Sequence, residues 1–565
     1  MKKASKKLLR NGLAIVAGLT IIPMASCKFA DGSSSVSNSV VSDVSSTSPD
    51  SDSSPIDSTS TSPSTSISIE VPKSDYDMSG ASFADATVPY DGLEHELVIT
   101  GALPEGVTVS YTSNKLTEVG TLTVTASFTG DDNHNPISDM VATLTVYDGD
   151  QLAFCLKEDG TYAVTGVKDT QATEIEIPSD YYGTAVTSIA ESAFSGCSNL
   201  TSVIIPEGIT LIEDSAFEGC LGLTSITVPN SVTRIGLSAF EGCTGLTSMA
   251  LPFVGEKADG TGETYFGYIF GADSYENNSG FVPTSLRKVN VASGSEISGH
   301  AFSYCTGITS ITISNSVTGI GDYAFYQCIS LTDITIPDKV TSLGEYIFYH
   351  CNSLTNIIIP SSVSSIGFNA FNRCGGLTSI TIPSSVTSIG NSAFSGCTGL
   401  IEVNISDIEA WAQIEFESAT SNPLYYSHGL YLNGTQITSI ELSSGIDSIG
   451  NYAFYNCTNL TSITIPSSVT CIGYMAFNGC TSLTSITIPS SVTSIGDSAF
   501  CNCSGLTSIT IPSSVTGIGY MAFNGCTSLT TIYYSGTVSQ WNAYGSQLGI
   551  NSGVVVICSD GSKTI

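Results

Sequence analysis

One motif recurs through most of this chain at a fixed interval of 23 residues. Within three runs the cysteines stand 23 residues apart, and a phenylalanine precedes each of them by three positions. A fixed period of about 20–29 residues predicts a solenoid, because one unit cannot bury its own apolar edges and must stack on its neighbours. The three runs contain twelve clear repeats, marked by Cys197, Cys220 and Cys243; by Cys305, Cys328, Cys351, Cys374 and Cys397; and by Cys457, Cys480, Cys503 and Cys526.

Each repeat carries an alternating strand pattern, and its consensus is C-x-x-L-T-S-I-T-I-P-S-S-V-T-S-I-G-x-x-A-F-x-x. In the segment LTSITIP, Ile463 and Ile465 are expected to point inward and Ser462 and Thr464 outward, because side chains alternate along a strand. We expect the remaining apolar residues of that repeat to close the coil: Val469, Ile472, Ala476 and Phe477.

The composition agrees with a β-rich, strongly acidic protein. Only 12% of the 565 residues are charged, and the formal net charge is −33. Such a surface repels phosphate backbones and disfavours electrostatic docking on anionic lipid, so nucleic acid is not an expected partner.

The first residues are typical of an export signal. Five basic side chains precede the apolar segment 12–24, which is too short to span a bilayer. The sequence Met24-Ala25-Ser26-Cys27 resembles a bacterial lipobox, which implies cleavage after residue 26 and lipid attachment to Cys27. The alternative is an ordinary secretory signal cleaved nearby. We therefore expect a signal peptide at 1–26 and a membrane anchor through the lipid on Cys27.

Two segments of different character follow the signal. Residues 27–68 are rich in Ser, Thr and Pro and are expected to form a disordered tether, because they cannot bury enough apolar surface to offset chain entropy. Residues 69–148 alternate apolar and polar residues between Gly and Asp turns, which predicts a small β-sandwich. Its Tyr90-Asp91-Gly92 and GTLTVTASFTGD segments resemble bacterial Ig-like modules of the MBG/YDG type, which usually act as spacers.

The 23-residue pattern resembles the BspA-like leucine-rich repeat, the Treponema-type repeat. This resemblance implies a mainly β solenoid over 190–530, with an N-terminal cap at 149–189, irregular repeats at 253–300 and 408–450, and a C-terminal cap at 531–565. It also implies an adhesin-like role at the cell surface, in binding host matrix proteins, host cells or other bacteria.

The ladder of cysteines has two interpretations. Equivalent positions on adjacent coils lie about 4.8 Å apart, which is close enough for disulfides. However, each cysteine has two equivalent neighbours and parallel Cβ vectors, so the pattern favours buried free thiols. The sequence contains no motif for a metal site, a cofactor or a catalytic triad, and we expect none of them and no enzyme activity.

The binding surface is expected where the repeat is least regular. A partner that recognised the uniform Ser/Thr rungs could slide along them, whereas the two irregular stretches occur once each and are rich in aromatics, which dominate binding hot spots. The function predicted is surface adhesion or binding of a protein or glycan ligand; the alternatives are a structural spacer of the cell envelope and an enzyme. The candidate partner-binding residues are Trp411, Tyr425, Tyr426 and Tyr431 in the second stretch and Tyr265, Tyr268 and Tyr275 in the first.

Overall fold

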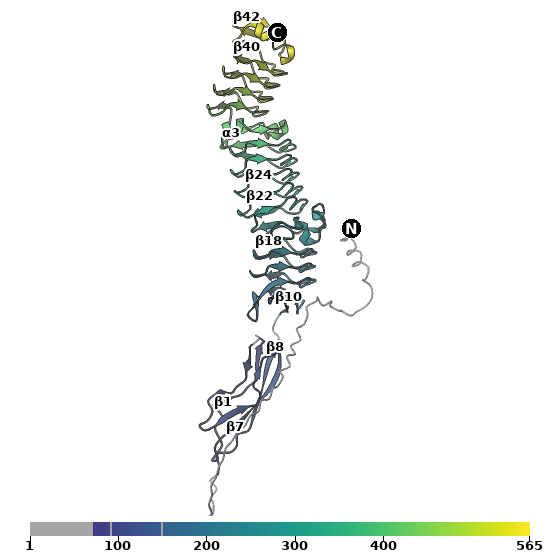
Figure 1. The fold of residues 1–565 in the computed structure, drawn as a ribbon, viewed down its shortest axis with the longest axis vertical. Coiled ribbons are helices and arrows are strands. Elements are labelled where there is room, and N and C mark those ends of the chain that lie inside the picture. The colour runs from purple at the N-terminus through teal and green to yellow at the C-terminus, as the bar shows by residue number, and fades with distance from the viewer. Residues whose placement is uncertain (1–71, 91–92, 148–150) are drawn as a thin grey trace, which may run out of the picture. The chain divides into compact units, whose positions relative to one another are not determined.

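The computed structural model describes residues 72–90, 93–147 and 151–565, and the chain divides into one unit at 1–150 and a second at 151–565. Both units are built from β-strands, and the second is a long stack of coils (Figure 1). The expected signal peptide, the lipid site at Cys27 and the tether at 27–68 all lie outside the described residues.

The described part of the N-terminal unit consists of β-strands around a small apolar core. Its largest sheet has the strand order β2-β8-β7-β5, in which β7 pairs antiparallel with both β8 and β5. Leu97, Val124, Ala142 and Leu144 are buried together in this unit. Its strands are β1 (Ala81–Ser82), β2 (Ala86–Pro89), β3 (His95–Glu96), β4 (Thr100–Gly101), β5 (Thr108–Tyr111), β6 (Lys115–Leu116), β7 (Gly120–Thr129) and β8 (Met140–Tyr147).

The solenoid has two rows of parallel strands, one on each side of the coils. We call the strands of the LTSITI segments row A; they pair in parallel as successive rungs and fall into four hydrogen-bonded sheets. Row A comprises β11 (Glu174–Glu176), β14 (Ser202–Ile204), β16 (Ser225–Thr227), β18 (Ser248–Leu251), β19 (Lys288–Val291), β21 (Ser310–Ile313), β23 (Asp333–Ile334), β26 (Ser379–Ile382), β28 (Glu402–Ile405), β30 (Leu430–Leu432), β32 (Ser439–Glu441), β34 (Ser462–Thr464), β36 (Ser485–Thr487), β38 (Ser508–Ile511), β40 (Thr531–Tyr534) and β41 (Val555–Cys558).

The strands of the shorter TSI segments form row B. They are mostly two residues long because the glycine after the isoleucine turns the chain toward the next side of the coil. Row B comprises β13 (Thr184–Ile189), β15 (Leu211–Ile212), β17 (Arg234–Ile235), β20 (Glu296–Ile297), β22 (Gly319–Ile320), β24 (Ser342–Leu343), β25 (Ser365–Ile366), β27 (Ser388–Ile389), β29 (Glu415–Phe416), β33 (Ser448–Ile449), β35 (Cys471–Ile472), β37 (Ser494–Ile495) and β39 (Gly517–Ile518).

The strand register equals the sequence period. Ser485 pairs with Ser508, and Ser365 pairs with Ser388, so each coil lies on the equivalent residues of the previous one. Ile463 and Ile465 are buried while Ser462 and Thr464 are exposed, which confirms the expected alternation. The phenylalanines form a continuous interior stack within each run; the rings of Phe371 and Phe394, for example, lie 5.3 Å apart.

Hydroxyl groups join one coil to the next. Thr378 Oγ1 donates to the carbonyl of Thr355 at 3.1 Å, and Ser385 Oγ donates to the carbonyl of Val363 at 2.6 Å. The same bonds recur at equivalent positions along the stack. The abundance of Ser and Thr therefore has a structural cause, because these side chains satisfy backbone carbonyls of the neighbouring coil.

The ends and the irregular stretches carry the remaining elements. The N-terminal cap contains β9 (Leu152–Leu156), β10 (Tyr162–Val167) and β12 (Asp180–Tyr181), and the C-terminal end contains α5 (Val538–Asn542), η4 (Ser546–Leu548) and β42 (Gly561–Thr564). The irregular stretches contain η1 (Phe266–Phe270), η2 (Tyr275–Asn277) and α2 (Asn278–Phe281), and then α3 (Ile408–Ala412), η3 (Ala419–Ser421), α4 (Leu424–Ser427) and β31 (Thr435–Gln436).

Candidate functional site: an aromatic edge

The turn between each row-B strand and the following cysteine has an unusual backbone. In all twelve repeats the residue before the alanine, or before Ile347 in one coil, is not glycine and has a φ of 52–60°. This left-handed conformation costs an L-residue about 1–2 kcal/mol. The residues that adopt it are Ser192, Ser215, Ser238, His300, Tyr323, Tyr346, Asn369, Ser392, Tyr452, Met475, Ser498 and Met521.

In the middle of the solenoid this position forms a stack of aromatic rings. Tyr275, from η2, lies 3.9 Å from His300, His300 lies 4.7 Å from Tyr323, and Tyr323 lies 4.6 Å from Tyr346, measured between ring centroids. The interplanar angles are 11–19°, so the rings lie nearly face to face. Phe368 ends the stack with an edge contact to Tyr346.

A second stack runs beside the first, on the residues that follow the repeat phenylalanine. Tyr326 and Tyr349 lie 5.0 Å apart at 8°, and Tyr304 contacts Tyr326 edge-on. The guanidinium carbon of Arg373 lies 5.8 Å from the ring centroid of Tyr349 and covers its face. We call the two stacks together the aromatic edge, which comprises Tyr275, His300, Tyr304, Tyr323, Tyr326, Tyr346, Tyr349 and Phe368.

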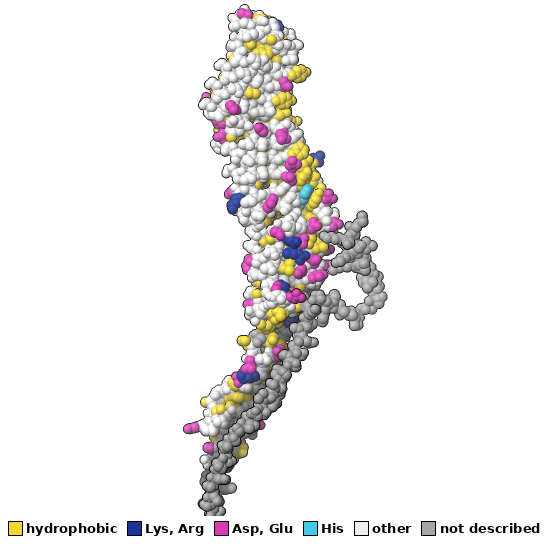
Figure 2. Space-filling view, in the orientation of Figure 1, with side chains coloured by type: hydrophobic (Ala, Val, Ile, Leu, Met, Phe, Trp, Pro, Cys, Tyr) yellow, Lys and Arg dark blue, Asp and Glu magenta, His cyan; other side chains and the backbone are white. Residues whose placement is uncertain are grey.

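The side chains of the aromatic edge are partly open to solvent. Its tyrosines and His300 are half-buried, and Phe368 is 36% exposed. On the face drawn in Figure 2, hydrophobic side chains gather along one edge of the solenoid beside a histidine and next to acidic groups.

The first irregular stretch is fastened to the regular coils by a buried amide. The Asn278 side chain accepts a hydrogen bond from the Gly267 amide at 3.0 Å and donates one to the Ser303 carbonyl at 2.7 Å. Because Asn278 follows η2 directly, these bonds help to fix η2 beside the coil of His300, where Tyr275 continues the stack.

Acidic side chains lie along the first stack. Burial lowers the pKa of His300, whereas the charges of Asp322 and Glu276 raise it. Burial also raises the pKa of Tyr323, as do its neighbour Tyr346 and the charges of Glu345 and Asp322. Three exposed acidic side chains therefore flank the stack: Glu276, Asp322 and Glu345.

Four consecutive coils are also unusual at the position directly before the cysteine. Six of the twelve repeats have glycine there, at positive φ and without strain, as at Gly396. The coils of the aromatic edge instead have Tyr304, Gln327, His350 and Arg373, at φ of 56–63°. Strained backbone of this kind gathers at functional sites.

The structure corrects three of the predicted binding residues. Trp411 is 1% exposed and its Nε1 donates to the Ala453 carbonyl at 2.9 Å, so it fills the coil. Tyr265 and Tyr268 are also buried, and the Tyr265 hydroxyl donates to the Ala272 carbonyl. These residues are aromatic because the wider coils need large side chains in their interior.

The other four predicted residues remain partly exposed, and their role in binding stays a prediction. Tyr275 belongs to the aromatic edge. Tyr425 stacks on Tyr455 at 5.8 Å, and the Tyr426 hydroxyl accepts a hydrogen bond from the Gly396 amide at 2.7 Å. Tyr431 lies in β30, away from these stacks in sequence.

From the sequence we predict binding in the irregular stretches and do not predict the aromatic edge. The signal lies in the regular repeats themselves: the positions written x in G-x-x-A-F-x-x-C are those that vary between coils. In three consecutive repeats they read GDYAFYQC, GEYIFYHC and GFNAFNRC, whereas the following repeat reads GNSAFSGC, with Ser and Gly there.

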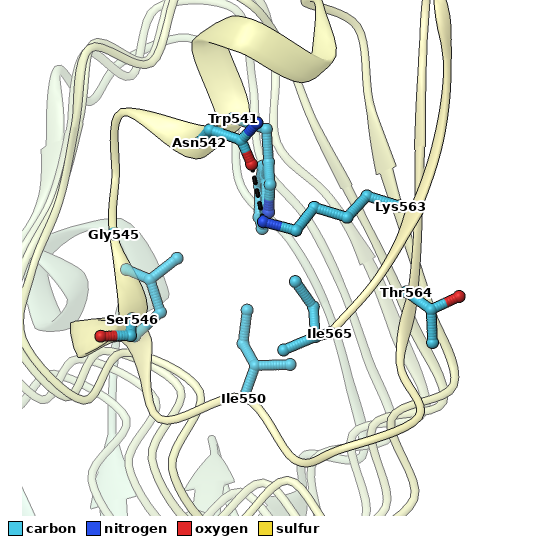
Figure 3. Close-up of a pocket in the computed structure, with 9 residues that line it drawn as sticks. Trp541, Asn542, Gly545, Ser546, Ile550, Lys563, Thr564 and Ile565 are labelled. Carbon is cyan, nitrogen blue, oxygen red and sulfur yellow. Dashed lines mark hydrogen bonds between the residues drawn. The ribbon is translucent and has the colours of Figure 1, made fainter.

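We also considered a cavity, a metal site and a membrane span in the described part of the chain. A cavity of about 590 Å³ opens at the C-terminal end, where Lys563 donates to the Asn542 side chain at 2.7 Å (Figure 3). Lys563 is the one ionisable side chain among the residues that line this cavity. Among the described residues no His, Cys, Asp and Glu side chains group as a metal site, and no helix there is long and apolar enough to cross a membrane.

The fold defines the class of protein: a leucine-rich-repeat solenoid whose coils repeat every 23 residues. The chain belongs to the BspA-type leucine-rich repeat family. The BspA type leucine rich repeat region matches residues 167–263, 277–420 and 428–545, which is more than half of the chain.

Solved structures include similar solenoids. A leucine-rich repeat protein from Bacteroides ovatus is 27% identical, with 72% of this chain and 98% of that chain covered and a TM-score of 0.40. A leucine-rich cell surface protein from Faecalibacterium prausnitzii is also 27% identical, with the same coverage and a TM-score of 0.31. No curated protein matches the chain.

Proposed function

We propose that this protein is an exported, non-enzymatic binding protein of a bacterial cell surface, and that the aromatic edge binds a protein partner. Membership of the BspA-type family and similarity to a protein described as a leucine-rich cell surface protein support the location.

The observation that carries the proposal is the concentration of aromatic side chains on strained turns in consecutive coils. Coils with Ser and Gly at these positions, such as the one with Ser392 and Gly396, form the same turn with less strain. Stability alone therefore does not require Tyr346 or His350 where they stand. Tyrosine is enriched in binding hot spots because it offers a rigid apolar surface and a polar tip.

The stacking geometry favours a protein over a glycan. Sugars pack their apolar faces on open ring faces, but the faces of His300 and Tyr323 are covered by their neighbours. What remains open is a row of ring edges, a surface suited to side chains and backbone groups of a protein.

The N-terminal segments fit display away from a membrane. In this proposal lipid on Cys27 anchors the chain, the 27–68 tether separates it from the membrane, and the 69–148 unit acts as an Ig-like spacer. The alternative, a solenoid that serves only as an envelope spacer, has no saturable partner.

The test is a surface plasmon resonance screen of the full chain against extracellular matrix proteins and purified bacterial surface proteins. The matched variant is Tyr323→Ser with Tyr346→Ser, because five other coils have serine at this left-handed position. We expect saturable binding that weakens at least about tenfold, or about 1.4 kcal/mol, in the variant while its melting temperature is retained. Binding that the variant leaves unchanged, or no saturable binding, would refute the proposal.

A further inference from the structure

We infer that the partner segment that binds the aromatic edge is cationic, an exposed arginine- or lysine-rich stretch of a protein. This inference rests on the proposed function and specifies the chemistry of its partner.

Three carboxylates border the first stack from different coils. Glu276 belongs to η2, beside Tyr275, whereas Asp322 and Glu345 directly precede Tyr323 and Tyr346 in the regular turns. All three residues are exposed. The side chain of Asp322 accepts a hydrogen bond from the backbone amide of Glu345 at 2.7 Å through one of its two oxygens.

The chain does not neutralise these charges itself. None of the three carboxylates forms an ion pair within the described residues, although Arg234 elsewhere in the solenoid pairs with three acids at once. The chain as a whole carries a net charge of −33, so its field attracts a cationic partner and repels an anionic one.

The second stack shows how such a partner fits. Arg373 covers the one open face of Tyr349 with its guanidinium, at the end of a stack whose other face is occupied by Tyr326. A basic side chain from a partner can lay its aliphatic stem along the ring edges of the first stack and place its charge beside Asp322 or Glu345.

The experiment measures binding of a defined probe to the full chain by fluorescence anisotropy at physiological ionic strength. The probe is a fluorescein-labelled peptide of alternating Arg and Ala, and its control replaces every Arg with Gln. The test variant is Glu276→Gln, Asp322→Asn and Glu345→Gln. The side-chain oxygen of the asparagine at 322 can still accept the hydrogen bond from the backbone N–H of residue 345. The charge-matched control is Glu174→Gln, Glu176→Gln and Glu441→Gln, three exposed residues of row A.

We expect saturable binding of the Arg peptide, a loss of at least tenfold in the test variant, and less than a twofold change in the charge-matched control. Equal losses in both variants would assign the attraction to net charge and overturn the inference, as would binding of a neutral glycan at the edge. A protein partner that responds to Tyr323→Ser with Tyr346→Ser but not to the charge variant would leave the proposed function standing and refute the cationic partner.

Discussion

The thiol of Cys374 donates a hydrogen bond to the carbonyl oxygen of Phe348 in the preceding coil, with an Sγ–O distance of 3.0 Å. The same bond recurs at eight other ladder cysteines. All twelve ladder cysteines are buried free thiols, the arrangement that the sequence favoured over disulfides. Cysteine suits this position because it packs as a small apolar side chain and still supplies a donor.

The first prediction is that the protein loses stability at alkaline pH. Burial raises the pKa of Cys374 from 9.0 to about 12. Between these values the unfolded chain releases a thiol proton that the folded chain keeps, so the free energy of unfolding falls as the pH rises from about 9 to about 12. Burial also raises the pKa of Cys328 and of Cys457.

Urea unfolding under reducing conditions at pH 7.5 and pH 10.5 tests this prediction. The midpoint should fall at the higher pH, and a thiol reagent at pH 8 should modify half-buried Cys471 before any ladder cysteine. A midpoint that does not change, or ladder thiols that react in the folded protein, would contradict it.

The structure of a single coil was predictable from the sequence, because the residues that determine it lie within one repeat. The alternation at Ile463 and Ile465 and the fixed spacing of phenylalanine and cysteine determine which side chains face inward, whatever the neighbouring coil contains. Stacking then follows from the period alone.

The aromatic edge was predictable only in part. Tyr323 and Tyr346 lie one period apart, so their stacking follows from the repeat, whereas Tyr275 joins them because Asn278 fastens the irregular stretch, which the period does not reveal. The burial of Trp411 was also not predictable. The sequence alone does not distinguish an aromatic side chain that fills the interior of a wide coil from one that is exposed to a partner.

The second prediction tests which positions face inward. Phe371 is fully buried between Phe348 and Phe394, so Phe371→Ala should lower the free energy of unfolding by about 3–5 kcal/mol. Ser379→Ala, on the outer side of row A, should change it by no more than about 0.5 kcal/mol. Chemical denaturation measures both, and equal effects would show that the inward and outward positions are exchanged.

The third prediction is that the non-glycine residues at positive φ in the turns of the aromatic edge lower the stability of the solenoid. His350 has a φ of 63° at a position where six coils have glycine, so His350→Gly should raise the free energy of unfolding by about 1 kcal/mol. The reverse change, Gly196→His, should lower the free energy of unfolding by a similar amount. A side chain at position 196 would hold the backbone in a strained left-handed conformation, but its Cβ would not clash with any neighbouring atom. A destabilised His350→Gly variant would show that the imidazole, not the backbone, determines stability at this turn.

The fourth prediction separates two aromatic residues of the second irregular stretch. Trp411→Ala should destabilise the solenoid by about 3–5 kcal/mol, because it leaves a cavity and a carbonyl of Ala453 without its indole donor. Tyr425→Ser removes a half-buried ring stacked on Tyr455 and should cost about 1 kcal/mol or less. Thermal denaturation compares the two, and a Tyr425→Ser variant as unstable as Trp411→Ala would place Tyr425 in the core.

The last prediction concerns the anchor. If Cys27 carries lipid, Cys27→Ala should abolish metabolic labelling with an alkyne fatty acid and release the protein from membranes, because two acyl chains suffice for stable attachment. Cys558→Ala is the matched control, since it removes a half-buried thiol near the other end of the chain and should leave both labelling and membrane attachment intact. A Cys27→Ala variant that remains membrane-bound would show that the lipobox prediction is wrong, and a natural chain that is never labelled would identify an ordinary secretory signal.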